Sequence, residues 1–329
     1  MRTGLTILFT LIFAFSLSSQ EKLKVVASAS MIADMATEII GDLHDIEMIV
    51  PIGGDPHLHE PTPSNASLVA GADLILINGL TFEGWINELI ENSGTAAKVV
   101  TVTEHITPLT SVTYANSADP HAWMDASLVK SYVRSIAEAM IDIDPSNKSV
   151  YTERQASYSQ QLDDLDNDIK AAIATIPEQK RILVTSHDAF QYYGRRYGIQ
   201  LEAIMGISTE AEAQTSDIRR VNRVIKEHKI PSIFVESTIN PKLIQTLATD
   251  NKVSIGGELY ADSLGDKDSP ASTYVDMMRY NTSTIVSALS KDLEDIIPEE
   301  GEGYNSQLIG LLIGALIAGL FVTARLMNK

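Results

Sequence analysis

Short apolar segments alternate with helix-forming segments over most of this chain, in two successive runs. Apolar strands that are joined through helices favour parallel sheets, because the connecting helices cover both faces of each sheet. The sequence therefore predicts an α/β fold with two lobes, each with a parallel sheet covered by helices, over residues 19–144 and 178–291. The first run is expected to hold strands at residues 23–30, 73–79 and 97–102, and a strand followed by a turn at 45–54. The strands expected in the second run are residues 181–186, 200–204, 232–237 and 252–257.

The two runs are separated by residues 145–177, which have a proline at each end and none between them. Apolar and tyrosine side chains recur here at mostly three- and four-residue steps, the spacing of one helix face. Such a helix would be about 45 Å long, so we predict a linking helix that runs along both lobes. A coiled-coil dimer is the alternative, but the stripe covers only about four heptads, and a monomer is expected. The stripe consists of Tyr151, Tyr158, Leu162, Leu165, Ile169, Ile173 and Ile176.

The first residues of the chain have the pattern of a secretory signal peptide. Arg2 precedes an apolar run that ends near Phe15, and small serine residues follow it. A basic start, a short apolar run and small residues are the three parts of such a peptide. Residues 1–18 are therefore expected to be a signal peptide, with an uncleaved anchor as the alternative.

The last residues have the pattern of a membrane anchor. Within residues 307–325, the run from Leu308 to Ala324 is apolar and, at 1.5 Å per residue, close to the minimum length that spans a bilayer. Arg325 and Lys329 end this segment, and positive charge favours the cytoplasmic side. Residues 292–306 form an acidic linker in front of it. We therefore expect a C-terminal transmembrane helix that holds a periplasmic, extracytoplasmic body on the cytoplasmic membrane.

The charge of the chain limits its possible partners. It has 43 acidic and 25 basic residues, a formal net charge of −18, which argues against nucleic acid and is compatible with a cationic ligand. It has no cysteine, so disulfides, thiolate metal ligands and a lipidated cysteine are all excluded within this sequence.

Four metal-binding side chains fall where the strands of such lobes end. In open α/β sheets, ligands bind beyond the carboxyl ends of the strands. His57 follows the second expected strand, His187 follows the fifth and Asp262 follows the last, while His121 lies in a turn before a helix. Three imidazoles and one carboxylate are a normal ligand set for zinc or another first-row divalent ion. We predict a metal site of these four residues between the lobes.

The other histidines have simpler interpretations. His44 lies in a polar turn, His105 follows a strand, and His228 lies on a charged helix end. His59 could face the same side as His57, but the four-ligand set is complete without it. Glu60 is expected to be structural or to accept a hydrogen bond from a metal-bound imidazole.

Five motifs resemble those of the zinc- and manganese-type solute-binding proteins of bacterial ABC importers. The motifs are "GGDPHLHEPTPSN", "DPHAWMD", "LVTSHDAFQYYGRRYGI", "FVESTINPK" and "GGELYADSLGD". The resemblance implies two α/β lobes on one long helix, with metal in the cleft, and its ligands correspond to His57, His121, His187 and Asp262. It also implies that Glu replaces His187 in members that carry manganese. Asn65 departs from the Asp of the family, and we expect it to serve as a helix cap.

These features predict a binding protein that captures Zn²⁺ or Mn²⁺ and delivers it to an ABC permease in the cytoplasmic membrane. A metal-dependent hydrolase is one alternative, although a catalytic zinc usually keeps an open position and four ligands close the site. The chain also lacks the HExxH, GxSxG and P-loop motifs. A metal-stabilised adhesin is the other alternative, and it predicts that the metal is not released.

Overall fold

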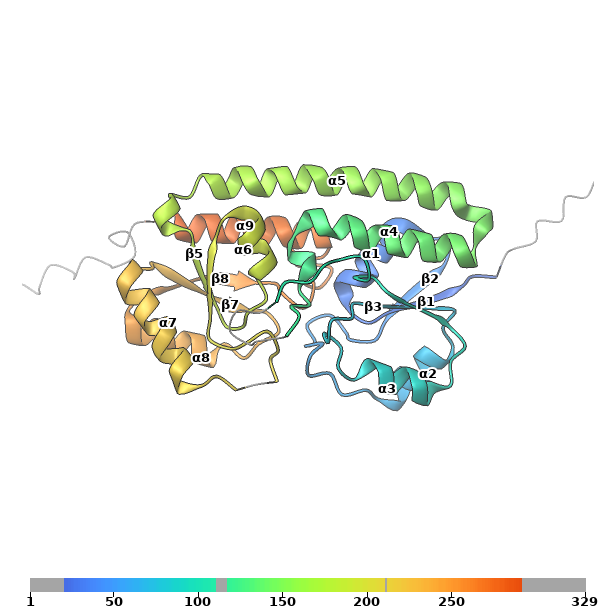
Figure 1. Cartoon of the computed structure of the whole chain (residues 1–329), viewed down its shortest axis with the longest axis horizontal. Coiled ribbons are helices and arrows are strands. Elements are labelled where there is room, and N and C mark those ends of the chain that lie inside the picture. Colours follow the sequence, from blue (N-terminus) through green and yellow to red (C-terminus); the bar gives the residue numbers. More distant parts are fainter. Residues whose placement is uncertain (1–20, 111–116, 211, 292–329) are drawn as a thin grey trace, which may run out of the picture.

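Of the 329-residue chain, the computed structural model describes residues 21–110, 117–210 and 212–291. Three expected segments lie outside the described residues: the signal peptide 1–18, the acidic linker 292–306 and the transmembrane helix 307–325. Within the described ranges, no helix combines the length and the apolar character needed to cross a membrane. The described chain forms two α/β lobes side by side, with one long helix along both (Figure 1).

The first lobe holds a parallel sheet with the strand order β2-β1-β3-β4. All four expected strands are present. They are β1 (Lys24–Ala27), β2 (Asp45–Met48), β3 (Leu74–Ile77) and β4 (Lys98–Thr101). Strand β2 occupies the start of the segment predicted as strand and turn, and the other three strands are shorter than predicted. The helices of this lobe are α1 (Ser30–Ile40), α2 (Pro63–Ala70), α3 (Ile86–Ser93) and α4 (Ala126–Ile143).

Alternate residues of the strands in this sheet pack against different helices. Val25 and Ala27 belong to the core beneath α1 and α4, whereas Val26 and Ile75 pack against α2 and α3. Successive side chains of a strand point to opposite faces, so a strand buried on both faces must be apolar throughout. This is the physical reason for the continuous apolar segments in the sequence.

The second lobe repeats this architecture. Its strands pair in parallel as β5–β6 and β7–β8, and β5 contacts β7. Helices α7 and α8 cover one face, and α6 and α9 lie on the other (Figure 1). The strands are β5 (Ile182–Thr185), β6 (Gln200–Ala203), β7 (Ser232–Glu236) and β8 (Ser254–Leu259). The helices are α6 (Gln191–Tyr197), α7 (Thr215–His228), α8 (Lys242–Asn251) and α9 (Tyr274–Leu289).

The long helix α5 (Lys148–Ala174) joins the lobes and lies along α4 and α9 (Figure 1). It is three residues shorter at each end than the predicted range, because residues Pro145–Asn147 form a separate 3₁₀ turn. Every residue of the predicted apolar stripe is buried. One continuous hydrophobic core runs beneath α5 through both lobes, so packing as well as the chain connects them.

Candidate metal centre

A tight turn positions His57 in the loop after β2. Asp55 Oδ1 accepts hydrogen bonds from the backbone N–H groups of His57 (2.8 Å) and Leu58 (3.4 Å). Such a bond from an Asp side chain to the backbone two residues on is a common turn device. From the start of α3, Trp85 donates its Nε1–H to Pro56 O at 2.8 Å. The turn is therefore fixed from within and from the neighbouring helix.

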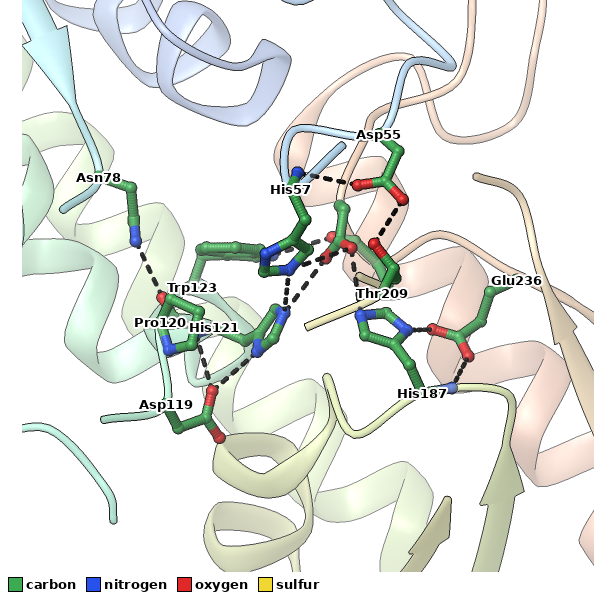
Figure 2. A network of polar contacts seen from close by, with 12 residues as sticks. Asp55, His57, Asn78, Asp119, Pro120, His121, Trp123, His187, Thr209 and Glu236 are labelled. Atoms are coloured by element: carbon green, nitrogen blue, oxygen red, sulfur yellow. Dashed lines mark hydrogen bonds and ion pairs between the residues drawn. The ribbon is translucent and has the colours of Figure 1, made fainter. Parts of the chain in front are cut away.

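The same device holds His121, but here the carboxylate also binds the ring. Asp119 Oδ1 accepts from the backbone N–H of His121 at 2.9 Å and lies 2.8 Å from its Nδ1. The backbone of the turn is held by Asn78, which donates to Pro120 O, and by Tyr192, which donates to Asp119 O. With Nδ1 engaged, Nε2 of His121 is the nitrogen that faces the other donors (Figure 2).

Glu236, the last residue of β7, positions His187 in an equivalent way. Glu236 Oε1 accepts from the backbone N–H groups of Ser186 (2.8 Å) and His187 (2.9 Å), which follow β5. Glu236 Oε2 lies 2.6 Å from His187 Nδ1. Carboxylate partners on the outer nitrogen fix the ring orientation of a metal-binding histidine and raise its basicity.

The structure brings all four predicted residues together. One donor atom from each of His57, His121, His187 and Asp262 lies within 4.8 Å of every other. Asp262 Oδ2 is 3.1 Å from His187 Nε2 and 3.8 Å from His57 Nε2, and Asp262 Oδ1 is 3.4 Å from His121 Nε2. Donors at tetrahedral angles and zinc distances lie about 3.3 Å apart. The spacing of the four donors therefore suits a zinc-sized ion.

The donor atoms are buried without ordinary partners. Among the described side chains, His187 Nε2 and both carboxylate oxygens of Asp262 are inaccessible and make no hydrogen bond of normal geometry. Polar atoms buried in this way are costly unless something satisfies them. A cation among the four side chains would satisfy all three atoms at once, which is the arrangement that a metal site requires.

The three histidines of the site differ in their pKa, because burial and neighbouring carboxylates act on them to different extents. Burial lowers the pKa of His57 to about 3, so this ring is neutral. Burial would also lower the pKa of His121, but Asp119 and Asp262 raise it to about 9. Burial acts the same way on His187, yet Glu236 and Asp262 hold its pKa well above the usual range. A metal ion entering the free site must therefore displace protons from His121 and His187.

The carboxyl group of Asp262 responds to the same charges. Burial alone would raise its pKa, but the neighbouring His187 and His121 hold it well below the usual range. Asp262 is therefore an ionised carboxylate at neutral pH, and it is the donor that supplies negative charge directly to a bound cation.

A small opening leads to the site beside His57. A cavity of about 160 Å³ is lined by residues of both lobes: His57, Thr81, Ser117, Ala118, Pro120, Gly206, Ile207 and Ser208. Of the four donors, His57 is the one that lines this cavity. As a whole residue His57 is 5% exposed, against 1% or less for the other three.

One expectation for a neighbouring residue was wrong. Glu60 is exposed and binds no imidazole, and the outer nitrogens of His121 and His187 instead face Asp119 and Glu236. Two sequence signals could have identified the carboxylates that face these outer nitrogens. One is the Asp of the "DPH" triplet, and the other is the Glu that ends β7.

His44 is buried rather than solvated. Its Nδ1 accepts from the backbone N–H of Leu23, and its Nε2 lies 3.0 Å from both Asp144 Oδ2 and Tyr151 OH. It therefore ties β2 to the turn between α4 and α5, far from the donor cluster. This is a structural role.

The remaining histidines lie outside the cluster, as expected. His105 and His228 are exposed. His59 faces Asn65 Oδ1 at 3.2 Å and stacks near Trp85, not toward His57. Asn65 and Thr62 form a reciprocal capping box at the start of α2, which confirms the capping role predicted for Asn65.

The sequence matches known families over most of its length. A family model described as the periplasmic component A of zinc-uptake complexes matches residues 25–288. The manganese-binding lipoprotein MntA of Halalkalibacterium halodurans is 37% identical over 271 residues, covering 82% of this chain and 90% of that protein. The zinc-binding protein TroA of Treponema pallidum is 37% identical over 275 residues, covering 81% and 89%.

The fold matches solved structures equally well. The periplasmic zinc-binding protein TroA from Treponema pallidum superposes with a TM-score of 0.79 at 34% identity, covering 82% of this chain and all of that one. A manganese-bound periplasmic metal-binding protein from Candidatus Liberibacter asiaticus gives a TM-score of 0.75 at 31% identity, with the same coverage.

Proposed function

Because the chain belongs to the family of periplasmic components A of zinc-uptake complexes, we propose that it captures zinc or manganese outside the cytoplasm and delivers it to an ABC permease. Relatives named for each of the two metals match more than four fifths of the chain. The observation that carries the proposal is the buried set of four convergent donors, two from each lobe. Within this set, His187 Nε2 and both carboxylate oxygens of Asp262 make no hydrogen bond with any residue that the structure describes.

In this proposal the metal is the cargo, and His57, His121, His187 and Asp262 are its ligands. Three imidazoles favour zinc, whereas manganese favours a larger share of carboxylate and other oxygen ligands. Zinc also binds more tightly than manganese to most sites of this kind, so preference in vitro and cargo in the cell are separate questions. The donor set supports binding of both ions, with zinc the tighter.

The structure gives no support to a hydrolase. Four protein donors surround the proposed ion, whereas catalytic zinc sites usually combine three with an open position for water. Such a hydrolase would need a general base for the metal-bound water, and Glu60, the candidate next to the His57 turn, is exposed and lies outside the donor cluster. The relatives are named as binding proteins and transporter components.

We further propose that residues 307–325 anchor the protein to the outer face of the cytoplasmic membrane. Several relatives are named lipoproteins, but this sequence has no cysteine to which a lipid could be joined. The apolar C-terminal segment, with Arg325 and Lys329 at its end, supplies another means of attachment. We propose that the body acts as a monomer.

Truncation after Pro298 should yield a protein that binds metal and needs no detergent, whereas the chain with its C-terminal segment should fractionate with membranes.

The central proposal is tested by elemental analysis of protein purified without added metal, followed by competition between zinc and manganese. We expect about one metal ion per chain and exchange of that ion on addition of a chelator. Absence of metal binding would refute the transport function. Binding without exchange would favour the adhesin alternative.

A further inference from the structure

The loop that carries His57 is joined to the second lobe at two points. The backbone N–H of Gly53 donates to Ser263 Oγ at 2.8 Å, next to the ligand Asp262. Thr209 Oγ1 donates to Asp55 Oδ2 at 2.7 Å (Figure 2). The first bond connects to the segment after β8 and the second to the segment after β6. They therefore hold the loop from two different parts of the second lobe.

The second bond lies beside the opening of the metal site. Thr209 directly follows Gly206, Ile207 and Ser208, which line the cavity that reaches His57. The other three donors are almost completely inaccessible, so an ion that leaves through this cavity passes His57. The position of the His57 turn relative to the segment 206–209 therefore determines how open this path is.

One side chain connects the ligand turn to the opposite lobe. Asp55 Oδ1 accepts from the backbone N–H of His57, and Asp55 Oδ2 accepts from the hydroxyl of Thr209. Both bonds end on the same carboxylate, so displacement of the Thr209 segment acts directly on the turn that orients His57. Hydrogen bonds to a charged group are among the stronger ones in proteins.

We propose that Asp55 and Thr209 are positioning residues that hold the His57 turn against the second lobe and slow the release of bound metal. The proposal rests on the transport function proposed above and assigns the rate of cargo release to a contact outside the four ligands. Separation of the lobes at this point would break the bond, free His57 and open the path to solvent. The bond thus links cargo release to movement between the lobes.

The test is the substitution Thr209→Val, which removes the hydroxyl and keeps the branched shape. Zinc dissociation from the full chain would be followed by stopped-flow with an excess of chelator. We expect release to be about 10- to 100-fold faster, the range for loss of one hydrogen bond to a charged group. Association should change by much less, since the four donors are intact. Thr209→Ser, which retains the hydroxyl, should restore slow release.

Thr246→Val is the matched control. Thr246 is an exposed residue of α8 in the same lobe, and its hydroxyl donates to Lys242 O within its own helix. This variant should release zinc at the wild-type rate. If Thr209→Val does not fold, Thr209→Ala makes the same test.

A double substitution gives a second, independent criterion. In an Asp55→Ala background the hydroxyl of Thr209 has lost its acceptor, so Thr209→Val should cause no further acceleration. The proposal would be overturned if Thr209→Val released zinc at the wild-type rate. It would also be overturned if Thr209→Val accelerated release equally in the wild-type and Asp55→Ala backgrounds. Failure of the wild-type chain to bind zinc would instead refute the transport function, which separates the two conclusions.

Discussion

Glu236→Gln should weaken metal binding although Glu236 touches no metal. The carboxylate accepts two backbone N–H groups through Oε1 and faces His187 Nδ1 through Oε2 at 2.6 Å. A glutamine of the same shape has only one acceptor oxygen. If that oxygen stays with the backbone, the amide N–H₂ faces Nδ1, and the ring must place its proton on Nε2 to avoid two opposed donors. The nitrogen that should bind the metal is then protonated.

Loss of such an outer partner typically reduces metal affinity by about 10- to 100-fold, or about 1.4 to 2.7 kcal/mol. The dissociation constant would be measured by calorimetry in competition with a chelator of known affinity. Glu202→Gln is the control, since Glu202 is half-buried and pairs with Arg220, away from the donor cluster. If Glu236→Gln folded normally and bound metal as tightly as the wild type, then Glu236 would not support metal binding by orienting the His187 ring.

Three further outcomes are expected. His121→Ala should lower metal affinity by orders of magnitude, whereas His228→Ala, at an exposed residue, should leave it unchanged. Equal losses of affinity in equilibrium dialysis would contradict the ligand assignment. Because carboxylates raise the pKa of His121 to about 9 and that of His187 above its usual range, protons oppose metal binding at neutral pH. Affinity should then rise by about tenfold or more from pH 7 to pH 8, with proton release visible by calorimetry in two buffers, and a flat profile would contradict this. Finally, His187→Glu should lower zinc affinity more than manganese affinity. If competition titrations gave an unchanged or increased ratio of zinc affinity to manganese affinity, His187 would not set selectivity.

The sequence predicted the two lobes and the donor set because both depend on short-range patterns. Strands buried on both faces must be apolar throughout, and three of the four clustered donors, His57, His187 and Asp262, follow the ends of parallel strands. The turn devices are local too: Asp55 and Asp119 each bond to the backbone two residues on, within a triplet that is visible in the sequence.

The sequence did not predict contacts between residues far apart along the chain, nor the form of two turns. The polar turn at His44 was predicted, but not its partners Asp144 and Tyr151, which come from another part of the chain. Glu60 was chosen because it lies near His57 in sequence, whereas the turn directs Glu60 to solvent. The ends of α5 were placed at the flanking prolines, but Pro145 begins a separate 3₁₀ turn. Local composition carries no information on these tertiary choices.

The shared core beneath α5 also constrains how the protein can mature during secretion. Helix α9 packs under α5, and the backbone N–H of Tyr274 at its start donates to Asp34 of α1 at 2.8 Å. A chain that crosses the membrane with its N-terminus first therefore lacks part of the packing of its first lobe until α9 has emerged. Asp262, the last of the four donors, emerges shortly before that helix. We expect partly secreted chains to hold no cargo and to depend on extracytoplasmic chaperones, so that loading with metal marks a fully translocated molecule.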